Sequence, residues 1–120
     1  KEKIVVWDPA YLFLDLSTLQ MGDKAGGLFE LKTDPAYRHL TAVKSGRLYA
    51  VLPYNGYTQN FGSIMANAYF IGKMLYPKKF TDIDPAARAD EIYTFLVGKP
   101  VFAKMKAAFG CLVCQPVPLD

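Results

Sequence analysis

The sequence predicts an α/β fold, a small three-layer lobe in which a short, mostly parallel sheet is flanked by helices. Two short apolar runs, each ended by a proline, alternate with segments of helical periodicity. The chain has 120 residues, which suits one compact domain, and 52% of them are hydrophobic. This fraction excludes a disordered tail, which combines low hydrophobicity with high charge.

The first strand is expected at residues 4–7, Ile-Val-Val-Trp, because β-branched and aromatic residues favour strands. Asp8 and Pro9 then suit the cap and the first position of a helix over residues 11–19. Three glycines among residues 21–27 predict a loop. Residues 28–31 are compatible with either a helix or a strand.

The next elements follow from capping and turn residues. Asp34 is placed to cap a short helix that begins at Pro35 and runs to Leu40. Ser45-Gly46 predicts a tight turn, and residues 47–52, Arg-Leu-Tyr-Ala-Val-Leu, predict the second strand, ended by Pro53. Residues 54–60 then form a polar and aromatic loop.

Three helices are expected to close the fold. The first covers 63–76, with a buried stripe at Ile64, Ala68, Ile71 and Leu75. The second starts with Asp84 as cap and Pro85 at its first position, ends at Gly98, and has an apolar face of Ala89, Ile92, Phe95 and Leu96. The third opens at Pro100, with inward residues Val101, Phe102, Met105 and Phe109.

The charges argue against a nucleic-acid partner. There are 14 basic and 11 acidic residues, a net charge of +3, and the basic residues are scattered. A nucleic-acid binder gathers such residues on one face. No apolar run approaches the roughly 18 residues that a membrane-spanning helix needs.

The sequence does not predict an enzyme. A hydrolase needs a nucleophile, a base and an orienting group, yet the chain has one histidine, His39, and no G-x-S-x-G elbow. No phosphate-binding loop or dinucleotide fingerprint occurs. His39 is expected to be a surface or packed residue and not a metal ligand, because no partner ligand is near it in sequence.

Cys111 and Cys114 form one C-x-x-C pair at the start of a proline-rich tail. A zinc site needs four ligands, and no second pair exists. The pair is therefore interpreted as a local disulfide or two free thiols, with a thiol–disulfide function as the alternative. We expect a lobe over residues 1–110 and a loosely ordered tail over 111–120.

Residues 34–49, Asp-Pro-Ala-Tyr-Arg-His-Leu-Thr-Ala-Val-Lys-Ser-Gly-Arg-Leu-Tyr, resemble a hallmark of periplasmic substrate-binding proteins of ABC importers, in their helical-backbone, iron-complex branch. Tyr37 stands where the family commonly has Trp, and Leu48 where it has Val. Residues 52–77 and 84–102 are similar to the same branch. The resemblance runs from about Ile4 to Phe109 and covers the C-terminal lobe of a two-lobed protein.

The resemblance implies a function in import. Family members capture an iron–siderophore, haem, corrinoid or related metal chelate in a cleft between the lobes, and then dock on the ABC permease. The expected ligand is thus an iron- or cobalt-containing chelate, with no intrinsic cofactor and no metal held by the chain itself. The expected location is periplasmic or extracellular, with a lipid anchor on a missing N-terminus as one option, and the missing N-terminal lobe is an expected partner.

Candidate ligand contacts come from two segments that are expected to follow the two strands. Ligands of open α/β sheets bind outside the carboxyl ends of the strands, and tyrosine and tryptophan rings suit a flat, partly polar chelate. The candidates are Trp7, Asp8 and Tyr11 in the first segment and Tyr54, Asn55, Tyr57, Gln59 and Asn60 in the second. Because family members dock on the permease through an acidic residue of each lobe, the resemblance also makes Glu30 and Asp34 docking candidates.

A stand-alone interaction module is the competing interpretation. A lobe without its partner would expose an apolar patch, and could associate with itself through that patch.

Overall fold

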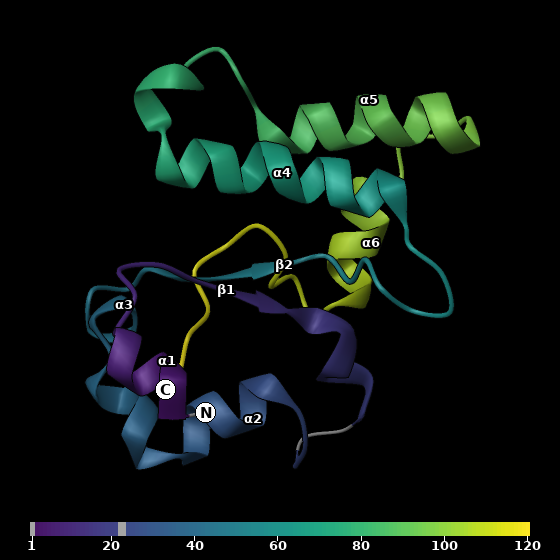
Figure 1. Ribbon diagram of the computed structural model, residues 1–120. Helices are drawn as coiled ribbons and strands as arrows, with labels where there is room; N and C mark the ends of the chain where they lie inside the picture. Colours follow the sequence, from purple (N-terminus) through teal and green to yellow (C-terminus); the bar gives the residue numbers. More distant parts are fainter. Residues whose placement is uncertain (1, 22–23) are drawn as a thin grey trace. The chain divides into compact units, whose positions relative to one another are not determined.

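The computed structural model describes residues 2–21 and 24–120, and it has an α/β architecture (Figure 1). The chain divides into two units. The first comprises Lys1–Val51 together with Leu112–Asp120, and the second comprises Leu52–Cys111. The sheet belongs to the first unit, and the two longest helices belong to the second.

The first unit is built around two parallel strands, β1 and β2, whose register runs from Leu12↔Leu48 to Asp15↔Val51. Short helical elements precede, connect and follow these strands. In chain order the unit contains α1 (Glu2–Trp7), β1 (Leu12–Asp15), the 3₁₀ helix η1 (Leu16–Met21), α2 (Gly27–Thr33), the 3₁₀ helix η2 (Pro35–His39), α3 (Thr41–Lys44) and β2 (Leu48–Val51).

The expected strand at residues 4–7 is wrong, and so is the first half of the expected helix over 11–19, of which only residues 16–19 are helical, in η1. Residues 4–7 belong to helix α1, and the strand is formed by Leu12–Asp15. The error comes from interpreting Asp8-Pro9 as the start of a helix. Asp8 has φ 40°, a left-handed conformation that ends a helix, and its N–H donates to the Ile4 carbonyl. The pair therefore terminates α1 instead of starting a helix.

The helix expected at Pro35–Leu40, the turn at Ser45-Gly46 and the strand expected at 47–52 are confirmed with slightly shorter bounds, whereas the short helix α3 was not expected. The Asp34 side chain accepts a hydrogen bond from the Ala36 N–H and caps η2, and Pro35 is the first residue of that helix. Gly46 has φ 68° in the turn before β2. The glycine-rich loop expected at 21–27 lies partly outside the described residues, at 22–23, and α2 begins at Gly27.

The two faces of the sheet carry different side chains. Leu12 and Leu14 of β1 share a face with Leu48 and Ala50 of β2, because register partners in a parallel pair point the same way. Leu48 and Ala50 are buried. On the opposite face the Phe13 and Tyr49 rings stack, with their centroids 5.8 Å apart.

The C-terminal tail is ordered along β2, contrary to the expectation of a loose end (Figure 1). The N–H of Cys114 donates to the Ala50 carbonyl, the Ala50 N–H donates to the Gln115 carbonyl, and the Val117 N–H donates to the Leu48 carbonyl. Val113 is completely buried and Val117 nearly so. The tail thereby supplies backbone partners that an edge strand would otherwise lack.

The second unit contains α4 (Phe61–Leu75), the 3₁₀ helix η3 (Pro77–Lys79), α5 (Pro85–Val97) and α6 (Phe102–Ala108), which confirms the three expected helices. Helices α4 and α5 lie side by side (Figure 1). The Asp84 side chain caps α5 through the Ala86 N–H, and Gly98 ends that helix at φ 76°. Proline at N1 and a left-handed glycine at the end are strong boundary signals.

The buried faces of these helices differ from those expected. In α4 the buried residues are Gly62, Ser63, Ala66, Asn67 and Phe70, whereas Ala68 and Leu75 are exposed. In α5 Ala89 and Tyr93 are buried, while Phe95 is 88% exposed. A Cβ on Gly62 would lie 3.0 Å from Leu96 and 3.1 Å from Tyr93. The helices pack closely through small residues, which a search for large apolar side chains overlooks.

Candidate functional site

The loop of residues 54–60, which we call the tyrosine loop, leads from β2 to α4 and is closed on itself. The Asn60 N–H donates to the Tyr54 carbonyl at 2.8 Å, and Asn55 and Gln59 form an antiparallel bridge. Tyr57 lies near the tip with its side chain fully exposed. These bonds hold a small hairpin that presents an aromatic ring to solvent.

Two amide side chains connect the tyrosine loop to α4. Asn60 Oδ1 accepts a hydrogen bond from the Ser63 N–H at 3.0 Å, so the side chain caps the helix. Just before the loop, the Leu52 N–H donates to Asn67 Oδ1 at 2.9 Å, and Asn67 Nδ2 donates to the Leu52 carbonyl at 2.8 Å. Both Leu52 and Asn67 are buried. Hydrogen bonds to α4 therefore hold the loop in place at both of its ends.

The candidates of the first segment do not lie where the sequence placed them. Trp7 is the last residue of α1 and is 72% exposed. Trp7, Asp8 and Tyr11 all precede β1, so they lie at the amino end of that strand. Ligands of open α/β sheets bind at the carboxyl ends of the strands, so this rule supports the tyrosine loop as a ligand contact but not Trp7, Asp8 or Tyr11.

Asp8 has a structural task. Its Oδ1 accepts the Thr41 N–H at 2.6 Å, and its Oδ2 accepts the Thr41 hydroxyl at 2.7 Å. Asp8 thus supplies the side-chain cap that Leu40, the residue before α3, lacks. The backbone hydrogen bond from Thr41, then its hydroxyl and the charge of Lys44, hold the pKa of Asp8 below its usual value. Tyr11 is also engaged, with the Arg47 guanidinium 5.2 Å from the centre of its ring.

The two permease-docking candidates, Glu30 and Asp34, differ in how accessible their carboxylates are to a partner. Asp34 is half-buried and its carboxylate caps η2, whereas Glu30 is exposed on α2. His39 is exposed in the last turn of η2. Among the described residues, no group of three or more His, Cys, Asp or Glu side chains is arranged to hold a metal ion.

Cys111 and Cys114 are not joined by a disulfide, and Cys111 is exposed while Cys114 is half-buried. Both have φ 59°. A reactive cysteine is usually found at a helix N-terminus, where the dipole stabilises the thiolate. Cys111 instead follows the C-terminal end of α6, and its N–H donates to the Lys106 carbonyl. This placement gives no support to the thiol–disulfide alternative.

Sequence reasoning missed Asn67, Ser63 and Thr41. The hydroxyls of Ser63 and Tyr93 lie 2.8 Å apart and join α4 to α5. A polar residue within an apolar helical run, as at Asn67 and Ser63, was an available signal, because buried polar groups are kept where they satisfy a partner. Thr41 carried no such signal, since its partner Asp8 lies 33 positions away.

No model of a known protein family matches this chain, and no curated protein sequence matches it. None of the helices in the described part of the chain is long and apolar enough to cross a membrane.

Proposed function

We propose that this chain is the ligand-capturing C-terminal lobe of a two-lobed substrate-binding protein for an ABC importer, and that its ligand is an iron- or cobalt-containing chelate. The observation that carries the proposal is the tyrosine loop, an exposed aromatic hairpin that follows a parallel strand and is fixed to a long helix. The sequence resemblance in residues 34–49 selects this ligand class.

The loop suits a flat ligand for physical reasons. Tyr54 and Tyr57 are exposed aromatic side chains, and an aromatic ring has two rotatable side-chain angles, so little conformational entropy is lost when a ligand orders it. Asn55 and Gln59 are exposed beside them and add amide donors and acceptors. Since the backbone is already fixed by hydrogen bonds, binding does not have to order it.

The remaining candidates take different roles in this proposal. Trp7 is exposed and can contact a ligand or the other lobe. Asp8 and Tyr11 act on the protein itself, through Thr41 and Arg47. Glu30 is the better permease-docking candidate, because the carboxylate of Asp34 already serves as a helix cap. The proposal places the protein in the periplasm or outside the cell, with the permease and the N-terminal lobe as partners and without catalysis.

Binding is tested in the two-lobed protein that the proposal requires, by titration with ferric siderophores, haem and cobalamin while intrinsic fluorescence is recorded. Each tyrosine ring is expected to contribute about 0.5–1.5 kcal/mol. Replacing both Tyr54 and Tyr57 by Ala should therefore cost about 1–3 kcal/mol and weaken binding about 5- to 150-fold.

Tyr76→Ala is the matched control, because Tyr76 is an exposed tyrosine that ends α4, outside the tyrosine loop. It should leave the affinity unchanged. Equal losses in both variants, or an unchanged affinity in the Tyr54/Tyr57 variant, would rule out the loop as the binding site. Lack of response to all three ligand classes would rule out the proposed function.

Self-association is the second candidate function, and a separate observation favours it. The second unit exposes a set of large side chains on two packed helices, which we call the α4–α5 apolar face: Phe61, Met65, Phe95 and Leu96. Each is more than half exposed. Part of this face is an open groove of about 340 Å³ lined by Met65, Glu91, Ile92, Phe95 and Leu96.

The apolarity and the charge balance of this face suit a second copy of the chain. Phe61 and Phe95 are 67% and 88% exposed, so covering both would bury about 230–390 Å², and Met65 and Leu96 add to this. This area would form the apolar centre of an interface, for which roughly 800 Å² per partner is standard. The charge of Glu91 is balanced by Arg88, whose guanidinium lies 2.7 Å from its carboxylate. Two copies therefore bring no net charge together.

Sedimentation velocity across a dilution series tests this candidate. The unchanged chain should show a concentration-dependent dimer, and Phe95→Asp should abolish it. Val6→Asp is the control, since Val6 is similarly exposed, at 80% against 88% for Phe95, but lies in the other unit. A monomer at all concentrations in the unchanged chain would eliminate this function.

A further inference from the structure

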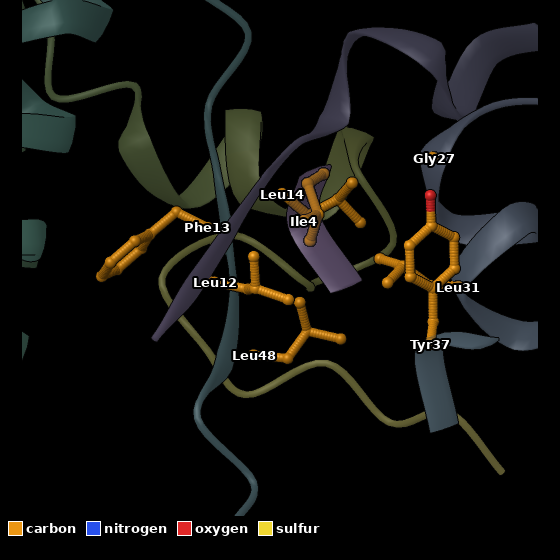
Figure 2. A pocket seen from close by; sticks show the side chains of 8 residues that line it. All are labelled: Ile4, Leu12, Phe13, Leu14, Gly27, Leu31, Tyr37 and Leu48. Carbon is orange, nitrogen blue, oxygen red and sulfur yellow. The ribbon is translucent and has the colours of Figure 1, made fainter. Parts of the chain in front are cut away.

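The first unit contains an apolar pocket of about 180 Å³ on the face of the sheet that carries Leu12 and Leu14 (Figure 2). Its walls come from α1, β1, α2, η2 and β2. The lining residues are Ile4, Leu12, Phe13, Leu14, Gly27, Leu31, Tyr37 and Leu48. No residue proposed above for chelate binding, permease docking or self-association belongs to this set.

The chemistry of the walls is almost purely hydrocarbon. Of the described lining residues, Tyr37 alone has a polar side-chain atom, and Figure 2 shows its hydroxyl at the Gly27 end of the pocket. The Phe13 ring points away from the other side chains, which agrees with its stacking on Tyr49 on the opposite face. Water needs two to four polar partners to be held well, and this pocket offers few.

The size of the pocket selects a ligand class. An enclosed apolar cavity of about 150 Å³ in another protein accepts benzene or xenon. A pocket of about 180 Å³ has room for one aromatic ring with a small substituent, and not for a macrocycle or a chelate. Ile4, Leu14 and Leu31 are half-buried, so a ligand can enter without unfolding the unit.

We infer that this pocket is a binding site for a small, uncharged, mainly apolar molecule of the size of one aromatic ring. Burial of the ring against leucine and isoleucine side chains supplies the binding free energy, and a charged substituent would lose its hydration without gaining a counter-charge. The pocket acts independently of the tyrosine loop, which lies in the other unit.

The test is an NMR titration of the whole ¹⁵N-labelled chain with phenol, and with benzoate as the charged analogue of similar size. Phenol should give saturable shifts at the amides of Ile4, Leu14, Gly27 and Leu31, with a dissociation constant on the order of 0.1–1 mM, as expected for so few ligand atoms. Benzoate should bind at least tenfold more weakly. Equal shifts with benzoate, or phenol shifts that do not saturate, would overturn the inference.

Two variants that fill the pocket locate the site. Leu31→Phe adds a ring to the wall and should weaken phenol binding at least tenfold. Leu75→Phe, at the half-exposed end of α4, makes the same change outside the pocket and should have no effect.

Gly27→Ala is the second filling variant, because a Cβ at Gly27 would lie 2.8 Å from Leu14 Cδ1 and would crowd this end of the pocket. It keeps the Gly27 N–H that donates to Thr18. If Leu31→Phe fails to fold, a loss of binding in Gly27→Ala still supports the site. Undiminished binding in a folded filling variant would place the phenol elsewhere and refute it.

Discussion

Asn67 offers the sharpest test of how the tyrosine loop is fixed. Its side chain is buried and forms two hydrogen bonds with the backbone of Leu52, which is itself fully buried. Asn67→Leu keeps the volume and removes both partners at once. The Leu52 N–H and carbonyl would then be buried without partners, at a cost of about 1–3 kcal/mol each. The expected loss of stability is about 2–6 kcal/mol.

This loss is large compared with the roughly 5–15 kcal/mol that stabilises a typical domain. Urea unfolding followed by circular dichroism measures it, and the slope of the transition should stay the same if the unfolded state is unchanged. Ile71→Leu, a half-buried position of the same helix, is the control and should cost below about 1.5 kcal/mol. A loss below about 0.5 kcal/mol in Asn67→Leu would refute the argument, since it would mean that water or a shifted backbone satisfies Leu52.

Asn67→Asp refines the same test. The carboxylate keeps an acceptor for the Leu52 N–H but faces the Leu52 carbonyl with a second oxygen in place of the donor. The protonated acid restores the donor, so the pKa of the introduced group must be raised in the folded state. The penalty should be small below the unfolded pKa of about 3.9 and should grow as pH rises toward the folded value. A pH-independent penalty would contradict this reasoning.

Three further predictions concern other contacts. Asp8→Asn keeps an acceptor for Thr41 but removes the charge. The pKa of Asp8 is lowered on folding, so the stabilising effect of its carboxylate is present above the unfolded pKa and is lost as pH falls through the folded pKa. The free energy of unfolding should therefore fall less steeply with decreasing pH in the variant than in the unchanged chain. Gly72→Ala should lower the thermal midpoint, because a Cβ there would lie 2.5 Å from the Phe80 ring, and overpacking costs about 1–3 kcal/mol. Val113→Ala should cost about 2 kcal/mol in urea unfolding, because the side chain is completely buried.

Each of these has an outcome that would contradict it. An unaltered acid limb in Asp8→Asn would show that its charge does not matter to folding. A rise in the thermal midpoint of Gly72→Ala would show that Phe80 moves aside and that the better helix propensity of alanine decides. Val6→Ala is the control for Val113→Ala, since Val6 is 80% exposed, and equal effects would show that the tail does not pack on β2.

The sequence by itself determined the elements whose boundaries are set by local chemistry. Asp34-Pro35 and Asp84-Pro85 start helices because an aspartate oxygen accepts the first free N–H and proline needs no donor there. Gly98 ends α5 because its left-handed backbone is costly for other residues. The strand at Leu48–Val51 and the loop that follows it were also predictable from an apolar run stopped by a proline.

Only the tertiary structure decided which apolar run became the first strand. Residues 4–7 have the stronger β propensity, but Leu12–Asp15 pairs with β2, and propensity is a weak preference that pairing and burial override. Likewise the partners Asp8–Thr41 and Leu52–Asn67, the buried faces of α4 and α5, and the docking of the tail on β2 depend on residues far apart in sequence. Local sequence does not specify such contacts, because a buried polar atom needs a hydrogen-bond partner and that partner can lie far away in the sequence. Only the packing of the complete fold brings the two together.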